Sequence, residues 1–167
     1  ELSYRKAIEL NPDFTNAHLN LGNILNDLGE SQEAFNSYLK VIEINPTFDN
    51  IYPTITRFLQ DSDLSQLNKS KLKTILNLLL EKNNVSHQEL FQVFNFLYSN
   101  KVISNLERFD SDSFKEKSIK VFSNDKLIIN ALKKIPFKDY ILEKNLTKTR
   151  KELCYLIAKN IEEISYS

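Results

Sequence analysis

The dipeptide Asn-Pro occurs twice in this chain, and Pro12 and Pro46 lie 34 residues apart (46 − 12 = 34). The twelve residues that end at each proline also match: seven of the twelve positions are identical, namely Ser, Tyr, Lys, Ile, Glu, Asn and Pro. Self-similarity at a fixed period of this length predicts a repeat architecture, in which each unit buries its apolar face against the next.

Composition favours helices in the rest of the chain. The 167 residues include only two glycines and four prolines, too few for the many turns of an all-β fold. Apolar residues recur at helical spacing in several segments. One such stripe is Leu72, Ile75, Leu76 and Leu79. The sequence therefore predicts an all-α fold.

The repeated segment resembles the tetratricopeptide repeat, a helix-turn-helix unit that stacks into a solenoid. The resemblance covers residues 1–61. It implies packing roles for Tyr4, Ala7, Pro12, Leu21, Gly22, Leu25, Gly29, Ala34, Tyr38 and Pro46. Gly22 is expected where two helices are closest, because it has no Cβ, and Gly29 is expected to end a helix in the left-handed conformation. His18 stands where the family has an aromatic residue, and Val41 where it has a small one.

We predict two domains, residues 1–61 and residues 62–167. The first is the end of a tetratricopeptide α-solenoid: a partial repeat, one full repeat and a degenerate repeat that caps it. The cap is a helix over residues 49–60, whose apolar face would cover Tyr38 and Ile42. Thr56 replaces the family's glycine, and no second helix with the family's Ala, Tyr and Pro follows.

The second predicted domain is a helical bundle. Its helices are expected over residues 69–82, 86–97, 125–135 and, as one helix or two, 137–159. Capping boxes at residues 86–89 and 113–116 would each open a segment. A weak strand-like pattern occurs only at residues 120–123.

In this repeat family the first helix of each unit faces a concave groove, and its exposed positions contact the ligand. By resemblance, those positions here are Asn16, Leu19, Asn20, Asn23, Asn26 and Asp27. Asparagine amides both donate and accept hydrogen bonds, so a row of them on one helix face suits an extended peptide backbone. Residues 20–23 resemble the asparagine ladder of the family's peptide-glycosylating members. The alternative is that asparagine is simply common in this chain, and that these residues lie on a solvent-exposed face without binding a ligand. This helix has no basic residue, so we expect no clamp for a terminal carboxylate.

The residue types exclude most catalytic chemistry from the chain. Its two histidines, His18 and His87, lie far apart in sequence, and its single cysteine, Cys154, has apolar neighbours and fits a buried thiol in a reducing, cytoplasmic compartment. Two glycines cannot form a phosphate-binding loop. We therefore predict no catalytic residue, no metal site and no cofactor. No apolar run is long enough for a membrane span, so no membrane partner is expected.

Charge is balanced overall but unevenly distributed. Residues 1–61 hold 4 basic and 9 acidic side chains, whereas residues 114–160 hold 12 basic and 5 acidic ones. The basic residues are mostly lysines spread over several expected helices without a recognised motif, so we predict no nucleic-acid binding. The tail around Lys133, Lys134 and Lys138 is an alternative place for a partner, and intramolecular docking to a downstream domain is a further expectation.

The tail has a resemblance of its own over residues 125–157. It is similar to a helical segment that lies between tetratricopeptide repeats and a methyltransferase-like domain in some bacterial proteins. The matching residues are Asp139, Tyr140, Ile141, Leu142, Glu143, Leu146, Thr147, Arg150 and Leu153, while Thr149 replaces a leucine. The chain has no methionine and begins inside a repeat, so we expect it to be a fragment of a longer polypeptide.

These observations predict a protein- or peptide-binding scaffold module of a larger polypeptide. The alternative is the non-catalytic leader of a methyltransferase or glycosyltransferase whose catalytic domain lies beyond residue 167. A third class is a self-association module.

Overall fold

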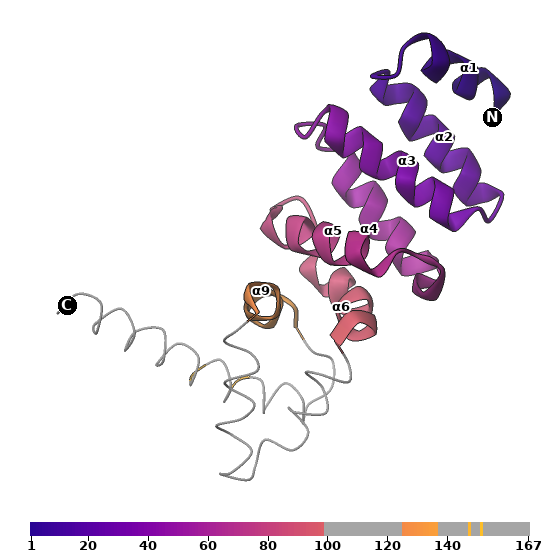
Figure 1. The fold of residues 1–167 in the computed structure, drawn as a ribbon. Coiled ribbons are helices and arrows are strands. Elements are labelled where there is room, and N and C mark those ends of the chain that lie inside the picture. Colours follow the sequence, from indigo (N-terminus) through magenta and orange to yellow (C-terminus); the bar gives the residue numbers. More distant parts are fainter. Residues whose placement is uncertain (99–124, 137–146, 148–150, 152–167) are drawn as a thin grey trace. The chain divides into compact units, whose positions relative to one another are not determined.

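The structure, a computed structural model, describes residues 1–98 and 125–136 together with residues 147 and 151 (Figure 1). The chain divides into two compact units, Glu1–Glu89 and Leu90–Ser167. All regular structure in the described residues is helical, without a strand, which confirms the predicted all-α fold class. In this part of the chain no helix has both the length and the apolar character needed to cross a lipid bilayer.

The first unit is a series of consecutive helices (Figure 1). They are α1 (Leu2–Leu10), α2 (Thr15–Asp27), α3 (Ser31–Ile44), α4 (Ile51–Asp61), the short 3-10 helix η1 (Leu64–Gln66) and α5 (Lys69–Glu81). Short loops reverse the chain between neighbours, so α2 packs against both α1 and α3, and α3 also packs against α4.

The repeated Asn-Pro sequence folds into a repeated corner. Asn11 and Asn45 end α1 and α3 with φ of −142° and −138°, because a residue that precedes proline disfavours the helical conformation. Their side-chain oxygens accept hydrogen bonds from the backbone N–H groups two residues later, at 3.3 and 3.1 Å. The first helix that follows then bonds back to each corner: His18 Nε2 lies 2.8 Å from the carbonyl oxygen of Pro12, and the Tyr52 hydroxyl donates to that of Pro46.

Gly22 allows α2 and α3 to approach closely. A Cβ atom at position 22 would lie 2.6 Å from Cε1 of Tyr38, closer than side-chain atoms approach in folded proteins. The Tyr38 ring fills this space and is only 2% exposed. The turn that follows α2 is made by Gly29, whose φ of 78° lies in the left-handed region. The close contact between these two helices therefore depends on the missing side chain of Gly22.

The residues with expected packing roles fall into three groups. The buried ones are Leu21, Gly22, Leu25, Ala34 and Tyr38. Tyr4 and Ala7 are half-buried on α1. The residues at turns and corners are exposed, namely Pro12, Gly29 and Pro46. The first group forms the interior of the α2–α3 pair, whereas the last group shapes the chain between helices.

The first unit extends beyond residue 61, where the sequence analysis placed the end of the solenoid. The backbone N–H of Asn68 donates to Gln32 Oε1 at 2.9 Å, and the Lys71 amine donates to Asn36 Oδ1 at 2.7 Å, so α5 lies along α3. The unit ends at Glu89. The two boundaries differ because α5 joins the stack through these contacts without carrying the family's Ala, Tyr and Pro.

In the second unit the structure describes α6 (Phe91–Tyr98) and α9 (Lys126–Lys134). Helix α9 agrees with the helix predicted over residues 125–135. The Asp125 carboxylate caps it, because it accepts hydrogen bonds from the backbone N–H groups of Leu127 and Ile128 at 3.1 and 3.3 Å.

The capping box predicted at residues 86–89 does not form. This segment leads instead into the 3-10 helix η2 (His87–Leu90), in which the Glu89 backbone N–H donates to the Ser86 carbonyl oxygen at 3.0 Å. In a capping box, the Glu89 backbone N–H would donate to the Ser86 hydroxyl instead. Because the N–H bonds to the Ser86 carbonyl, the segment forms a 3-10 turn and the α-helix begins only at Phe91. The predictions for residues 113–116, 120–123 and, apart from helical Thr147 and Lys151, 137–159 lie outside the described residues.

Candidate functional site

A cleft of about 230 Å³ opens between α2 and α4, and α3 contributes one residue to its lining. It is lined by Asn23 and Asn26 from α2, Tyr38 from α3, and Pro53, Thr54, Arg57, Phe58 and Asp61 from α4. The buried rings of Tyr38 and Phe58 meet edge to face, with centroids 5.3 Å apart, and form an aromatic floor. Asn23, Asn26, Arg57 and Asp61 are exposed around this floor, and Thr54 is half-buried. An apolar base with a few convergent polar groups is the usual make-up of a ligand site.

A hydrogen bond fixes the orientation of one of these polar groups. The Tyr38 hydroxyl donates to Asn23 Oδ1 at 3.0 Å. Burial raises the pKa of Tyr38 to about 12, and the nearby Asp27 carboxylate adds to this effect, so the hydroxyl keeps its proton at neutral pH. The amide oxygen of Asn23 is therefore occupied. Its NH2 group has no partner in the described part of the chain and remains able to donate to a ligand.

The six predicted groove residues separate into two sets. Asn23 and Asn26 line the cleft, and Asp27 lies close enough to Tyr38 to affect its pKa. The other three, Asn16, Leu19 and Asn20, are exposed or half-buried on α2 but do not line the cleft. The structure therefore brings the C-terminal half of α2 together with α4.

Arg57 is the candidate residue that the sequence reasoning missed. The absence of a basic residue on α2 argued against a clamp for a terminal carboxylate, but that argument considered only one helix. Helix α4 contributes Arg57 to the same cleft. A signal was present in the sequence. Arg57 follows Asn23 by the 34-residue period, and Asp61 follows Asp27 by the same interval. Applying the period to the groove positions would have placed both residues in the site.

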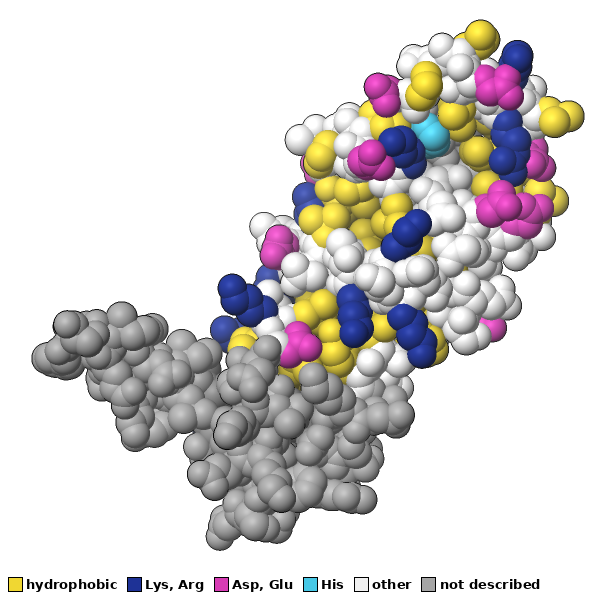
Figure 2. All heavy atoms as spheres, viewed as in Figure 1, with side chains coloured by type: hydrophobic (Ala, Val, Ile, Leu, Met, Phe, Trp, Pro, Cys, Tyr) yellow, Lys and Arg dark blue, Asp and Glu magenta, His cyan; other side chains and the backbone are white. Residues whose placement is uncertain are grey.

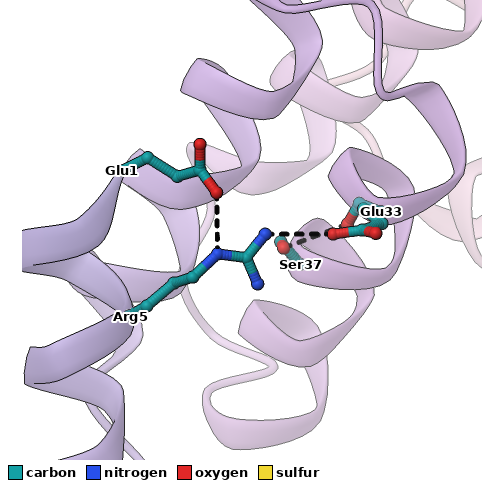
Figure 3. A network of polar contacts seen from close by, with 4 residues as sticks. All are labelled: Glu1, Arg5, Glu33 and Ser37. Carbon is teal, nitrogen blue, oxygen red and sulfur yellow. Dashed lines mark hydrogen bonds and ion pairs between the residues drawn. The ribbon is translucent and has the colours of Figure 1, made fainter.

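The two arginines that the structure describes differ in their partners. Arg5 Nε lies 2.8 Å from Glu1 Oε1, and Arg5 Nη2 lies 3.1 Å from Glu33 Oε2 (Figure 3). Hydrogen bonds to Glu1 and then Glu33 raise the pKa of Arg5. Arg57, in contrast, has no ion pair or hydrogen bond from its side chain within the described residues. Its charge is available to a ligand, whereas that of Arg5 is already paired.

Another cleft, of about 310 Å³, lies between α3 and α5. Its apolar lining is Leu39, Ile42, Ile75 and Leu78, with Glu43, Ser70, Lys71 and Thr74 beside it. Figure 2 shows this hydrophobic patch between the positions of α3 and α5, with charged side chains around it. Its base offers few hydrogen-bonding groups to a peptide backbone. It is therefore less suited than the α2–α4 cleft to holding an extended chain.

Groups for other chemistry are sparse in the described residues. No set of three or more His, Cys, Asp or Glu side chains there is placed to hold a metal ion. The His18 ring serves the first Asn-Pro corner, and its Nε2 carries a proton if it donates to the Pro12 carbonyl. Lys133 and Lys134 are exposed at the end of α9, while Lys138 and Cys154 lie outside the described residues.

Comparison with known proteins identifies one segment. The family model of the tetratricopeptide repeat matches residues 15–48, which comprise α2, α3 and the second Asn-Pro corner. This match confirms the predicted resemblance for that segment. No curated protein and no solved structure gave a significant match. The resemblance of residues 125–157 to a segment before a methyltransferase-like domain stays a prediction.

Proposed function

Because residues 15–48 are a tetratricopeptide repeat, a unit that generally serves protein interaction and not catalysis, we propose that this chain binds an extended segment of a partner protein in the cleft between α2 and α4. The chain acts as a scaffold in this proposal. Its solenoid part consists of α1, the α2–α3 pair and the α4–α5 pair, which serves as a further, divergent repeat.

The observation that supports this proposal most is the hydrogen bond between Tyr38 and Asn23. A peptide backbone presents a carbonyl acceptor and an N–H donor at every residue, so it binds where donors and acceptors already have fixed directions. Asn23 is held by Tyr38 with its NH2 group left to donate, and Asn26 lies one helical turn further along the same cleft. Fixing these groups before binding lowers the entropic cost of ordering them in the complex.

The test uses peptides selected by the full chain from a phage library of random sequences, and their affinities are measured by fluorescence anisotropy. Asn23→Asp keeps an oxygen for the Tyr38 hydroxyl but removes the two N–H donors, and Asn26→Ala removes the second amide. Each lost contact should weaken binding by about 0.5–1.5 kcal/mol. The melting temperature should change little for Asn26→Ala, because Asn26 is exposed.

Asn16→Asp is the matched control. It makes the same change of charge on the same helix, at an exposed position that does not line the cleft. We expect it to leave affinity unchanged. If Asn16→Asp and Asn23→Asp weaken binding equally, the loss of affinity comes from the added charge on α2 and not from a contact in the cleft. Selected peptides that bind Asn23→Asp and Asn26→Ala as tightly as the parent chain would contradict the proposal.

A further inference from the structure

A further cleft, called the second cleft below, lies on the side of α4 opposite the α2–α4 cleft. It has a volume of about 290 Å³ and is lined by Pro53, Thr56, Arg57 and Gln60 from α4 and by Asn84, Val85, Ser86 and Glu89 from the segment that follows α5. Two residues, Pro53 and Arg57, line both this cleft and the one between α2 and α4. They lie one helical turn apart, so they form a ridge along α4 with a hollow on each side.

Specific contacts hold residues 84–89 against α4. The Asn84 amide nitrogen donates to the carbonyl oxygen of Asp49 at 3.0 Å, just before α4 begins. The Lys82 ammonium group lies 4.0 Å from the centre of the Tyr52 ring, and the Val85 side chain is buried. This segment is therefore a fixed wall of the second cleft.

Arg57 on the shared ridge is flanked by acidic groups that do not neutralise it. Asp61 lines the first cleft and Glu89 lines the second, but no carboxylate within the described residues forms an ion pair with Arg57. Arg57 thus places one positive charge on the ridge, and the cleft on each side of the ridge contributes one carboxylate. A ligand with a single acidic side chain at its centre complements this arrangement, whereas a run of acidic residues would meet repulsion at both flanks.

We propose that the two clefts form one groove, and that Arg57 binds an Asp or Glu side chain in the middle of a peptide that runs from the α2–α4 cleft to residues 84–89. This inference rests on the proposed function. It specifies that the bound peptide has an internal acidic residue and that the binding surface extends to residues 84–89. A peptide fills both clefts only when its chain continues past the carboxylate. The arrangement therefore selects an internal acidic residue over a terminal carboxylate. Gln60 and Ser86 supply polar contacts to the part of the peptide beyond Arg57.

The experiment starts from the same selected peptides, synthesised with amidated C-termini and measured against the full chain. Arg57→Gln should weaken binding by about tenfold, the effect expected for losing one charge-assisted hydrogen bond. Replacing the acidic residue of the peptide by its amide should cause the same loss. The two changes together should cost no more than either alone, since both remove one interaction. Arg5→Gln is the control, because that arginine is already paired with Glu1 and Glu33.

The second cleft is tested separately. Gln60→Ala combined with Ser86→Ala should weaken binding of the whole peptide but not of a peptide cut and amidated just after its acidic residue. Selected peptides that depend on Asn23 and Asn26 but bind Arg57→Gln unchanged would overturn this inference and leave the proposed function standing. Binding that requires a free C-terminal carboxylate would overturn it as well. If the selected peptides bind the Asn23, Asn26 and Arg57 variants as tightly as the parent chain, both the inference and the proposed function are overturned. A selection that yields no peptide would also overturn both.

Discussion

The helix pairs α2–α3 and α4–α5 occupy equivalent places in the stack but pack at different distances. The backbones of α2 and α3 run close together over much of their length, whereas those of α4 and α5 approach each other at few points. One period after Gly22 stands Thr56, and one period after Tyr38 stands Leu72. Both Thr56 and Leu72 are buried. The first pair meets through a glycine and a ring, whereas the second pair has two side chains of intermediate size at the equivalent positions.

This difference separates two properties that the repeat motif combines. The Gly-Tyr contact sets how closely two helices pack within a repeat. Continuation of the stack depends instead on apolar residues that α4 and α5 bury, such as Ile55 and Leu72, and on the polar contacts of α5 with α3. A pair can therefore lose the motif at the contact positions and still extend the solenoid.

The largest expected effect is at Tyr38. Tyr38→Ala removes a buried ring that touches Gly22 and Phe58, so it should lower the free energy of unfolding by about 3–5 kcal/mol. Leu72→Ala at the equivalent position should cost about 2–5 kcal/mol, which would show that the wider pair is also a packed core. Urea unfolding followed by circular dichroism measures both. A loss below about 1 kcal/mol for Tyr38→Ala would contradict the close contact between α2 and α3.

The next effect is at Gly22. Gly22→Ala should destabilise the chain by about 1–3 kcal/mol, although alanine favours a helix, because its Cβ has no room beside the Tyr38 ring. Thr56→Ala at the equivalent position should change stability by less than about 1 kcal/mol. Adding Tyr38→Leu to Gly22→Ala should reduce the penalty, since it converts the close pair toward the α4–α5 type. Independent, additive effects of the two changes would show that the residues do not share one contact.

A smaller effect should appear at alkaline pH. The pKa of Tyr38 is about 12 in the folded chain against 10.0 for a free tyrosine, so unfolded tyrosine ionises first. The contribution to stability is therefore complete below pH 10 and is lost as the pH rises toward 12. Tyr38→Phe should show a shallower decline of the melting temperature over this range than the parent chain. Tyr98, whose pKa is also raised to about 12, is present in both proteins and cancels in the difference. Parallel declines would assign the pH dependence to other groups.

The smallest expected effect concerns the two corners. His18 and Tyr52 occupy equivalent positions and bond to the carbonyl oxygens of Pro12 and Pro46. His18→Phe should cost about 1 kcal/mol, because the Pro12 carbonyl loses its donor, and His18→Tyr should restore most of that loss. Thermal unfolding compares the two variants. A His18→Tyr protein as unstable as His18→Phe would show that the two corners are not interchangeable.

Only the part of the candidate site that α2 contributes could be predicted from the sequence, because the repeat resemblance was applied to that helix alone. The family resemblance assigned Asn23 and Asn26 to the groove side of α2, and both line the α2–α4 cleft. Arg57 was missed although it stands one period after Asn23. The second cleft was beyond reach, because residues 84–89 belong to no repeat and meet α4 only through contacts such as Asn84 with Asp49.

Local sequence specifies the features that depend on neighbouring residues. The Asn-Pro corners, the left-handed turn at Gly29 and the Asp125 cap follow from local conformational preferences and short-range hydrogen bonds. Contacts between distant residues establish which helices belong to the stack, where the first unit ends, and the position of Arg57 between two clefts. These features depend on side chains that are distant in sequence, as when Asn68 meets Gln32, and no local pattern specifies such a pairing.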